Sequence, residues 1–168
     1  LAVDAGLTTG PCGSIAVDKR AQTSDPDIYS AGDCADAFHI LTGQRVWVPL
    51  ALQANRSGRA AADNIFGKGL ELQGIAGSAV FRVFNLEIAR TGLNPEEALG
   101  NGFDPVEVVI RSRSRGHGYE GNKTIHVAMT GDKKTGRLLG VQMAGPEGAA
   151  HRIHAAAVAL HSGMKVAD

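Results

Sequence analysis

The chain has 168 residues, of which 43% are hydrophobic and 20% are charged, and these proportions are typical of a folded globular protein. Seventeen Lys and Arg residues balance seventeen Asp and Glu residues, so charge gives no reason to expect nucleic acid or an anionic membrane as the main partner. No apolar run approaches the roughly 20 residues that span a bilayer, and no secretory leader is visible. We therefore expect a cytoplasmic protein that binds neither nucleic acid nor membrane.

The cysteines and histidines do not predict a metal site. Cys12 and Cys34 lie far apart and form no C-x-x-C pair, which excludes a site built from neighbouring cysteines. The sequence leaves a disulfide between them open, although a reducing compartment disfavours it. We expect Cys34 to be a small buried residue and Cys12 to lie in a Gly/Pro turn. His154 and His161 would be about 10 Å apart along a helix, too far to share one ion.

The first elements in chain order are short. We expect a helix end over Leu1–Gly6, a strand over Ser14–Asp18, a second strand over Ile28–Ala31 and a loop or short strand pair over residues 35–47. Since the chain starts inside an apparent helix and not at Met, we expect it to be part of a longer polypeptide.

A helix rich in small residues follows. Pro49 suits its first turn, where a missing N–H costs nothing, and Gly67 suits its end. One face would carry Leu50, Ala54, Gly58, Ala61 and Ile65. The Gly-rich residues after Gly67 indicate a domain boundary, which gives predicted domains at 1–70 and 75–168.

The second half alternates as antiparallel strands do. Asn94–Glu97 predicts a capped helix start, with Pro95 in the first position and acidic residues in the first turn. A hairpin connection is expected over 131–136. The predicted order is a strand over 80–92, a short helix, strands near 106–110, 125–129 and 138–143, and a helix over 148–163. This order is typical of an α+β domain.

Gly32 and Asp33 follow the predicted strand and are the best candidates for binding chemistry. Glycine lets backbone approach a ligand closely, and an ionised Asp accepts strong hydrogen bonds from sugar-like hydroxyls. An ordinary Gly-Asp turn is the alternative. The helix that follows would direct its N-terminus, with about half a positive charge, toward the same place.

Residues Asp25–Cys34 and Val48–Arg59 together resemble the second flavin-contacting segment of the flavoprotein reductases that contain two dinucleotide-binding domains. The resemblance implies that Asp33 holds the ribityl chain of FAD. It also implies that the start of the following helix faces the pyrimidine edge of the flavin. The cofactor-binding residues carried over are Gly32, Asp33 and the backbone at Leu50 and Ala51.

Three further segments resemble the interface domain of the same family, and they are Ser78–Leu93, Leu138–Gly145 and Ala150–Met164. The implied fold is α+β: an antiparallel sheet with helices on one face, preceded by a strand–helix remnant of an α/β FAD-binding domain. The resemblance implies a homodimer whose missing N-terminal domains use NAD(P)H. It also implies that this interface domain lacks its last helix.

His117–Gly121 is similar to a Tyr-Tyr-Pro-Gly turn that coenzyme A-disulfide reductases and related NADH oxidases direct toward the thiol site of the partner subunit. Tyr119 and Gly121 are kept, but Gly118 and Glu120 stand where a tyrosine and a proline would. The resemblance implies that Tyr119 contacts substrate in the partner subunit, and the departures leave coenzyme A specificity open. A hairpin turn with a packed tyrosine is the alternative.

Arginines alternate just before this turn, at positions 111, 113 and 115. They form either a solvated strand edge or a clamp for an anionic substrate such as a coenzyme A phosphate.

We therefore interpret the chain as part of a flavin-dependent NAD(P)H:disulfide oxidoreductase or NADH oxidase. It would supply part of the FAD site and the subunit interface and would not be catalytic alone, because the phosphate-binding glycines, the redox cysteine and the nicotinamide domain of that family are not found in it. No catalytic residue is assigned. An autonomous dimerisation or interaction module without a cofactor is the alternative.

Overall fold

The computed structural model describes all 168 residues, which form two compact units, Leu1–Ile75 and Ala76–Asp168. No helix in either unit is both long and apolar enough to cross a bilayer.

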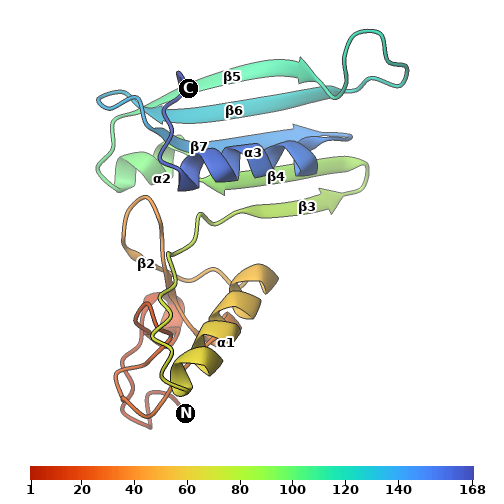
Figure 1. Cartoon of the computed structure of the whole chain (residues 1–168). Helices are drawn as coiled ribbons and strands as arrows, with labels where there is room; N and C mark the ends of the chain where they lie inside the picture. Colours follow the sequence, from red (N-terminus) through yellow and green to blue (C-terminus); the bar gives the residue numbers. More distant parts are fainter. The chain divides into compact units, whose positions relative to one another are not determined.

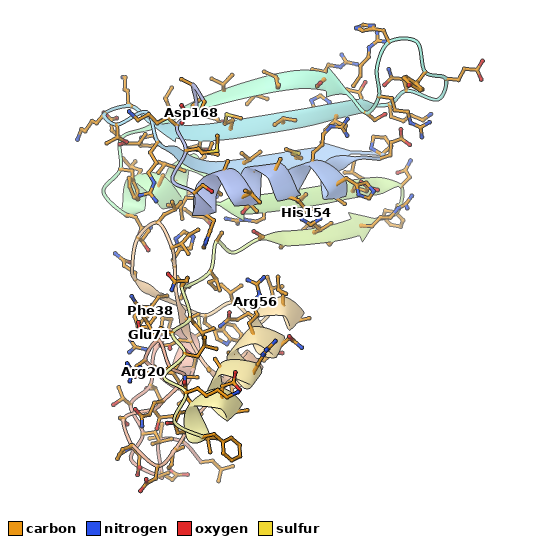
Figure 2. All side chains as sticks on the ribbon, in the orientation of Figure 1. Arg20, Phe38, Arg56, Glu71, His154 and Asp168 are labelled. Carbon is orange, nitrogen blue, oxygen red and sulfur yellow. The ribbon has the colours of Figure 1, made fainter.

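The first unit is mostly turns and short elements around one helix. Its elements are η1 (Pro11–Gly13), η2 (Gly32–Cys34), β1 (Ala37–Phe38), β2 (Arg45–Val46) and α1 (Ala51–Ile65). The two short strands pair antiparallel, which confirms the strand pair expected over residues 35–47. An ion pair between Arg20 and Glu71, with a distance of 3.3 Å between nitrogen and oxygen, links two loops of this unit (Figure 2).

Three short elements predicted for this unit were wrong. Residues 1–6 form turns and no helix. The strands expected over 14–18 and 28–31 are reduced to isolated bridges, from Ile15 to Thr9 and Ala35, and from Tyr29 to Gln22. The apolar alternation is present in both segments, but a strand needs a partner over several residues, and each segment finds a partner at only one position.

Helix α1 begins two residues later than expected. Leu50 is the N-cap residue, so Pro49 precedes the helix and does not occupy its first turn. The helix ends as predicted, because Gly67 adopts a φ of +78° and donates its N–H to the carbonyl of Asn64. The predicted apolar face was partly wrong: the buried residues are Ser57, Ala60, Ala61 and Asn64, whereas Ile65 is 60% exposed.

The second unit is a five-stranded antiparallel sheet with strand order β3-β4-β7-β6-β5, and Figure 1 shows α3 lying along it beside β7 and β4. The fold class is therefore the α+β class that the sequence predicted. The elements are β3 (Ala79–Val83), β4 (Leu86–Gly92), α2 (Pro95–Gly100), β5 (Pro105–Arg113), β6 (Thr124–Asp132), β7 (Leu138–Gly145) and α3 (Ala149–His161).

The strand expected over residues 80–92 is instead a hairpin. Val83 pairs with Leu86, and Phe84 reverses the chain with a φ of +52°. The sequence offers no glycine at this turn, which is why the alternation reads as one continuous strand. The hairpin predicted over residues 131–136 is confirmed, since β6 and β7 pair on either side of it.

The core of the second unit lies between α3 and one face of the sheet. Ile153 and Leu160 of α3 are buried, as are Ile125 of β6 and Val141 of β7. Val108 of β5 is 54% exposed, because α3 packs on β4 and β7 and does not reach the edge strand. The apolar residues that alternate over 106–110 are therefore not covered in this unit.

Helix α2 has the predicted start. The Asn94 side chain accepts a hydrogen bond from the Glu97 N–H at 2.8 Å, and the Glu97 carboxylate accepts one from the Asn94 N–H at 2.8 Å. This reciprocal capping box satisfies two N–H groups at the helix start. Arg90 of β4 joins the box through an ion pair of 2.7 Å with Glu97.

Candidate functional site

The candidate site is built around η2, a single 3₁₀ turn that brings Gly32, Asp33 and Cys34 beside α1. Gly32 has a φ of +80°, which other residues rarely adopt, and a Cβ atom at this position would lie 3.7 Å from the Cβ of Ala54. The glycine is therefore required by the backbone conformation of the turn. It lies against the second turn of the helix.

Two side chains hold the backbone of this turn. The Gly32 N–H donates to Oγ of Ser57 at 3.1 Å, and Ser57 is 3% exposed. The Trp47 indole N–H donates to the backbone carbonyl of Asp33 at 2.8 Å. The turn is thus fixed from α1 on one side and from the segment before α1 on the other.

The Asp33 side chain is exposed and has no hydrogen-bond or ion-pair partner in the structure. A carboxylate on a fixed backbone can accept hydrogen bonds from hydroxyl groups of a ligand without first breaking an internal bond. The geometry fits the role that the resemblance implies for Asp33 in binding a polyol chain.

The start of α1 supplies the second polar feature of the site. Leu50 at the N-cap has an extended backbone and no side-chain oxygen to cap the helix. Ala51 and Leu52 are exposed and precede Ala54 by one turn or less, which is about 4.5 Å along the axis. The uncapped N–H groups and the positive end of the helix dipole are therefore close to the η2 turn and favour a ligand with negative charge.

A buried ion pair lies behind the turn. The Asp36 side chain is fully buried and accepts hydrogen bonds from the Val17 N–H at 3.0 Å and from Nη1 of Arg45 at 2.8 Å. Arg45 also donates to the Val17 carbonyl at 2.8 Å and lies 4.9 Å above the ring centroid of Phe38. This network joins the loop before η2 to β1 and β2, so it supports the base of the site.

In the second unit, the structure places Tyr119 in the loop between β5 and β6, with 70% of the residue exposed. The base of this loop is fixed by Glu147, whose carboxylate accepts hydrogen bonds from Ser114 at 2.7 Å and from Arg115 at 3.1 Å. The Ser114 hydroxyl, followed by Arg115, holds the pKa of Glu147 below its ordinary value. Tyr119 is therefore exposed to solvent in a loop whose base is held by the hydrogen bonds of Glu147.

The remaining candidates are dispersed. Arg115 is engaged by Glu147, whereas Arg111 and Arg113 are exposed on the edge strand. The structure holds no group of three or more His, Cys, Asp or Glu side chains placed to bind one metal ion. Cys34 is exposed and forms no disulfide, so the expectation of burial was wrong; its Sγ donates to the Ala31 carbonyl at 3.2 Å.

Three residues that shape the site were missed in the sequence. Ser57 reads as a polar interruption of a small-residue helix, Trp47 as an isolated aromatic, and Arg45 as a loop cation. Helical periodicity could have identified Ser57, because it lies on the same face of α1 as Ala61 and Asn64, and that face is buried. No local pattern identifies the partners of Trp47 or Arg45.

Comparison with known families gives two matches. The family model described as pyridine nucleotide-disulphide oxidoreductase, dimerisation domain, matches residues 78–168. The model described as pyridine nucleotide-disulphide oxidoreductase matches residues 1–58.

Among curated proteins, the chain is 40% identical over 168 residues to an NAD(P)H coenzyme A polysulfide/persulfide reductase of Pyrococcus horikoshii, covering 100% of this chain and 38% of that protein. It is 34% identical over 155 residues to an NADH oxidase of Streptococcus pyogenes, covering 92% of this chain and 34% of that protein. The chain thus spans little more than a third of the length of these relatives.

Among solved structures, an NAD-dependent persulfide reductase from A. fulgidus matches with a TM-score of 0.93 and 34% identity, over 98% of this chain and 31% of that one. A reduced Bacillus anthracis protein named CoADR-RHD matches with a TM-score of 0.93 and 33% identity, over 99% of this chain and 30% of that one.

Proposed function

Because the chain belongs to the pyridine nucleotide-disulphide oxidoreductase family, we propose that it forms part of an FAD-dependent, NAD(P)H-using oxidoreductase. The activity would be reduction of a coenzyme A-linked disulfide or persulfide, or oxidation of NADH. Relatives with both kinds of name support these two alternatives. The observation that carries the proposal is the exposed, unpartnered Asp33 carboxylate beside the uncapped start of α1.

In this proposal Asp33 accepts hydrogen bonds from the ribityl hydroxyls of FAD, and Gly32 lets the backbone approach the cofactor. The backbone at Leu50 and Ala51 would face the pyrimidine edge of the flavin, with the Ala51 N–H as the donor there, because the Leu50 N–H donates to the Val48 carbonyl at 2.9 Å. Bound FAD would supply the hydride- and electron-accepting chemistry. The residues of this chain bind and orient it, and the helix start favours the negative charge that a reduced flavin carries.

The second unit would form the interface of a homodimer. The dimerisation-domain match over residues 78–168 supports this assignment. Tyr119 lies in an exposed loop, so it is available to reach a substrate bound by the partner subunit. Arg111 and Arg113 lie on the strand that leads into this loop and could accompany it as contacts for an anionic substrate.

We place the protein in the cytoplasm. Both cysteines are exposed and form no disulfide, which suits a reducing compartment.

A titration of the isotope-labelled chain with FAD tests the flavin site. Amide chemical shifts detect weak as well as tight binding, so they suit a site of which this chain holds a part. We expect FAD to shift the amides of Gly32, Asp33, Leu50 and Ala51, and Asp33→Ala to weaken binding about tenfold, as expected for loss of charge-assisted hydrogen bonds. No shifts at millimolar FAD, together with a stable dimer by sedimentation, would support an interaction module without cofactor instead.

A further inference from the structure

We infer that Ser57 and Trp47 are positioning residues for the flavin site: they fix the backbone on both sides of Asp33, so that its carboxylate is presented to the cofactor without any bond of its own. The inference rests on the flavin site proposed above and extends it to two residues that do not themselves touch the acidic side chain.

Ser57 connects η2 to α1. Its hydroxyl donates to the carbonyl of Gln53 at 2.8 Å and accepts the Gly32 N–H at 3.1 Å, so the oxygen has a defined donor role and a defined acceptor role. Ser57 is 3% exposed, and water has little access to replace it. The peptide between Ala31 and Gly32, one residue before Asp33, is therefore fixed to the second turn of the helix.

Trp47 fixes the peptide that follows Asp33. Its indole N–H donates to the Asp33 carbonyl at 2.8 Å. The only tryptophan of the chain thus directs its one polar atom to the residue proposed to bind the ribityl chain. The residue remains 41% exposed, so burial of apolar surface alone does not account for its placement.

The two bonds hold the backbone of the turn and leave the Asp33 carboxylate without a hydrogen-bond partner. The N–H of Gly32 and the carbonyl of Asp33 both have side-chain partners, whereas the Asp33 carboxylate has none. Gly32 has a φ of +80°, so without these two bonds the turn has other conformations available to it. Loss of either bond is expected to let the turn rearrange and the carboxylate leave its position, which lowers affinity for a ligand that needs it in place.

The experiment compares FAD dissociation constants of variants of this chain, measured from amide shifts. Ser57→Ala removes the acceptor for Gly32, and Trp47→Phe keeps a ring but removes the donor to Asp33. We expect each to weaken FAD binding about fivefold, the usual effect of one hydrogen bond. Ser57→Thr retains the hydroxyl and should restore most of the affinity. Hydrogen exchange of the Gly32 amide should accelerate in Ser57→Ala and be slow again in Ser57→Thr.

The decisive comparison is made in the Asp33→Ala background. If Ser57 acts through Asp33, Ser57→Ala should change the dissociation constant less than twofold once the carboxylate is gone. Gly58→Ala is the matched control, because this neighbouring helix position has nothing within 4 Å of an added Cβ. It should strengthen the helix and leave FAD binding unchanged.

The outcomes separate the two proposals. If wild type shows no FAD shifts, or Asp33→Ala binds as tightly as wild type, the flavin site is wrong and the positioning role falls with it. If Asp33→Ala weakens binding but Ser57→Ala and Trp47→Phe do not, only the positioning role is overturned. An equal loss from Ser57→Ala with and without Asp33 would also overturn it.

Discussion

Replacing Arg45 should destabilise the first unit more than replacing a charged residue that has no buried partner. Asp36 has a side chain that is 0% exposed, and Arg45 provides Nη1 within 2.9 Å of both its oxygens. In Arg45→Met the buried carboxylate would keep only the Val17 N–H, and the Val17 carbonyl would lose its side-chain donor. Breaking a buried ion pair from one side costs about 3–5 kcal/mol. Because the Arg45 side chain is 39% exposed and water can enter, we expect about 3 kcal/mol.

Urea unfolding followed by tryptophan fluorescence is the assay, since Trp47 is the only tryptophan and lies in this unit. With a denaturant slope of about 1.5 kcal/mol/M, the midpoint should fall by about 2 M. Arg56→Met is the control, because Arg56 is exposed on α1 and has no ion pair (Figure 2); it should change stability by less than about 0.5 kcal/mol. A loss in Arg45→Met as small as in this control would refute the reasoning.

Three further predictions concern the second unit. Asn94→Ala removes half of the capping box and should cost about 1 kcal/mol, seen as a lower melting temperature. Leu160→Ala, at a residue 1% exposed, should cost about 3 kcal/mol, whereas Val158→Ala on the exposed side of α3 should cost little; equal effects would show that the packing is misassigned. The depressed pKa of Glu147 contributes stability that is present above its ordinary value of 4.5 and is lost as pH falls through the lower folded pKa, so Glu147→Gln should flatten stability against pH below 4.5.

The parts of the fold that could be predicted from sequence are those specified locally. Asn94 and Glu97 form the predicted capping box because the two partners are three residues apart, and Gly67 ends α1 because glycine adopts its positive φ without the strain that a side chain adds. The hairpin between β6 and β7 is likewise set by its own turn residues.

The predictions were wrong where burial or strand pairing depends on residues that are distant in the sequence. Alternation at Val108 indicates which face is apolar, but it does not say whether another element covers that face, and α3 does not reach it. Ile28–Ala31 has strand-like residues and only one pairing position, so it forms no strand.

The sequence predicted the residues proposed to contact the cofactor, and that role stays a prediction. It did not predict the residues that hold the turn in place. Gly32 and Asp33 stand out because they are neighbours in a recognisable segment. Ser57 is 25 residues from Gly32 and Trp47 is 14 from Asp33, and only the folded chain brings them together.

The edge position of β5 has a consequence for handling the protein in solution. Val106, Val108 and Ile110 form an apolar row on a strand whose outer hydrogen-bonding groups have no neighbouring strand. Such an edge invites a strand of another molecule to add to it. The opposite face of this strand carries Glu107 and Arg111 on either side of the exposed Val109, so a strand added to the edge would lie beside these two charges. Charged side chains on an edge strand oppose such addition, so we expect that neutralising both would make the purified chain precipitate sooner.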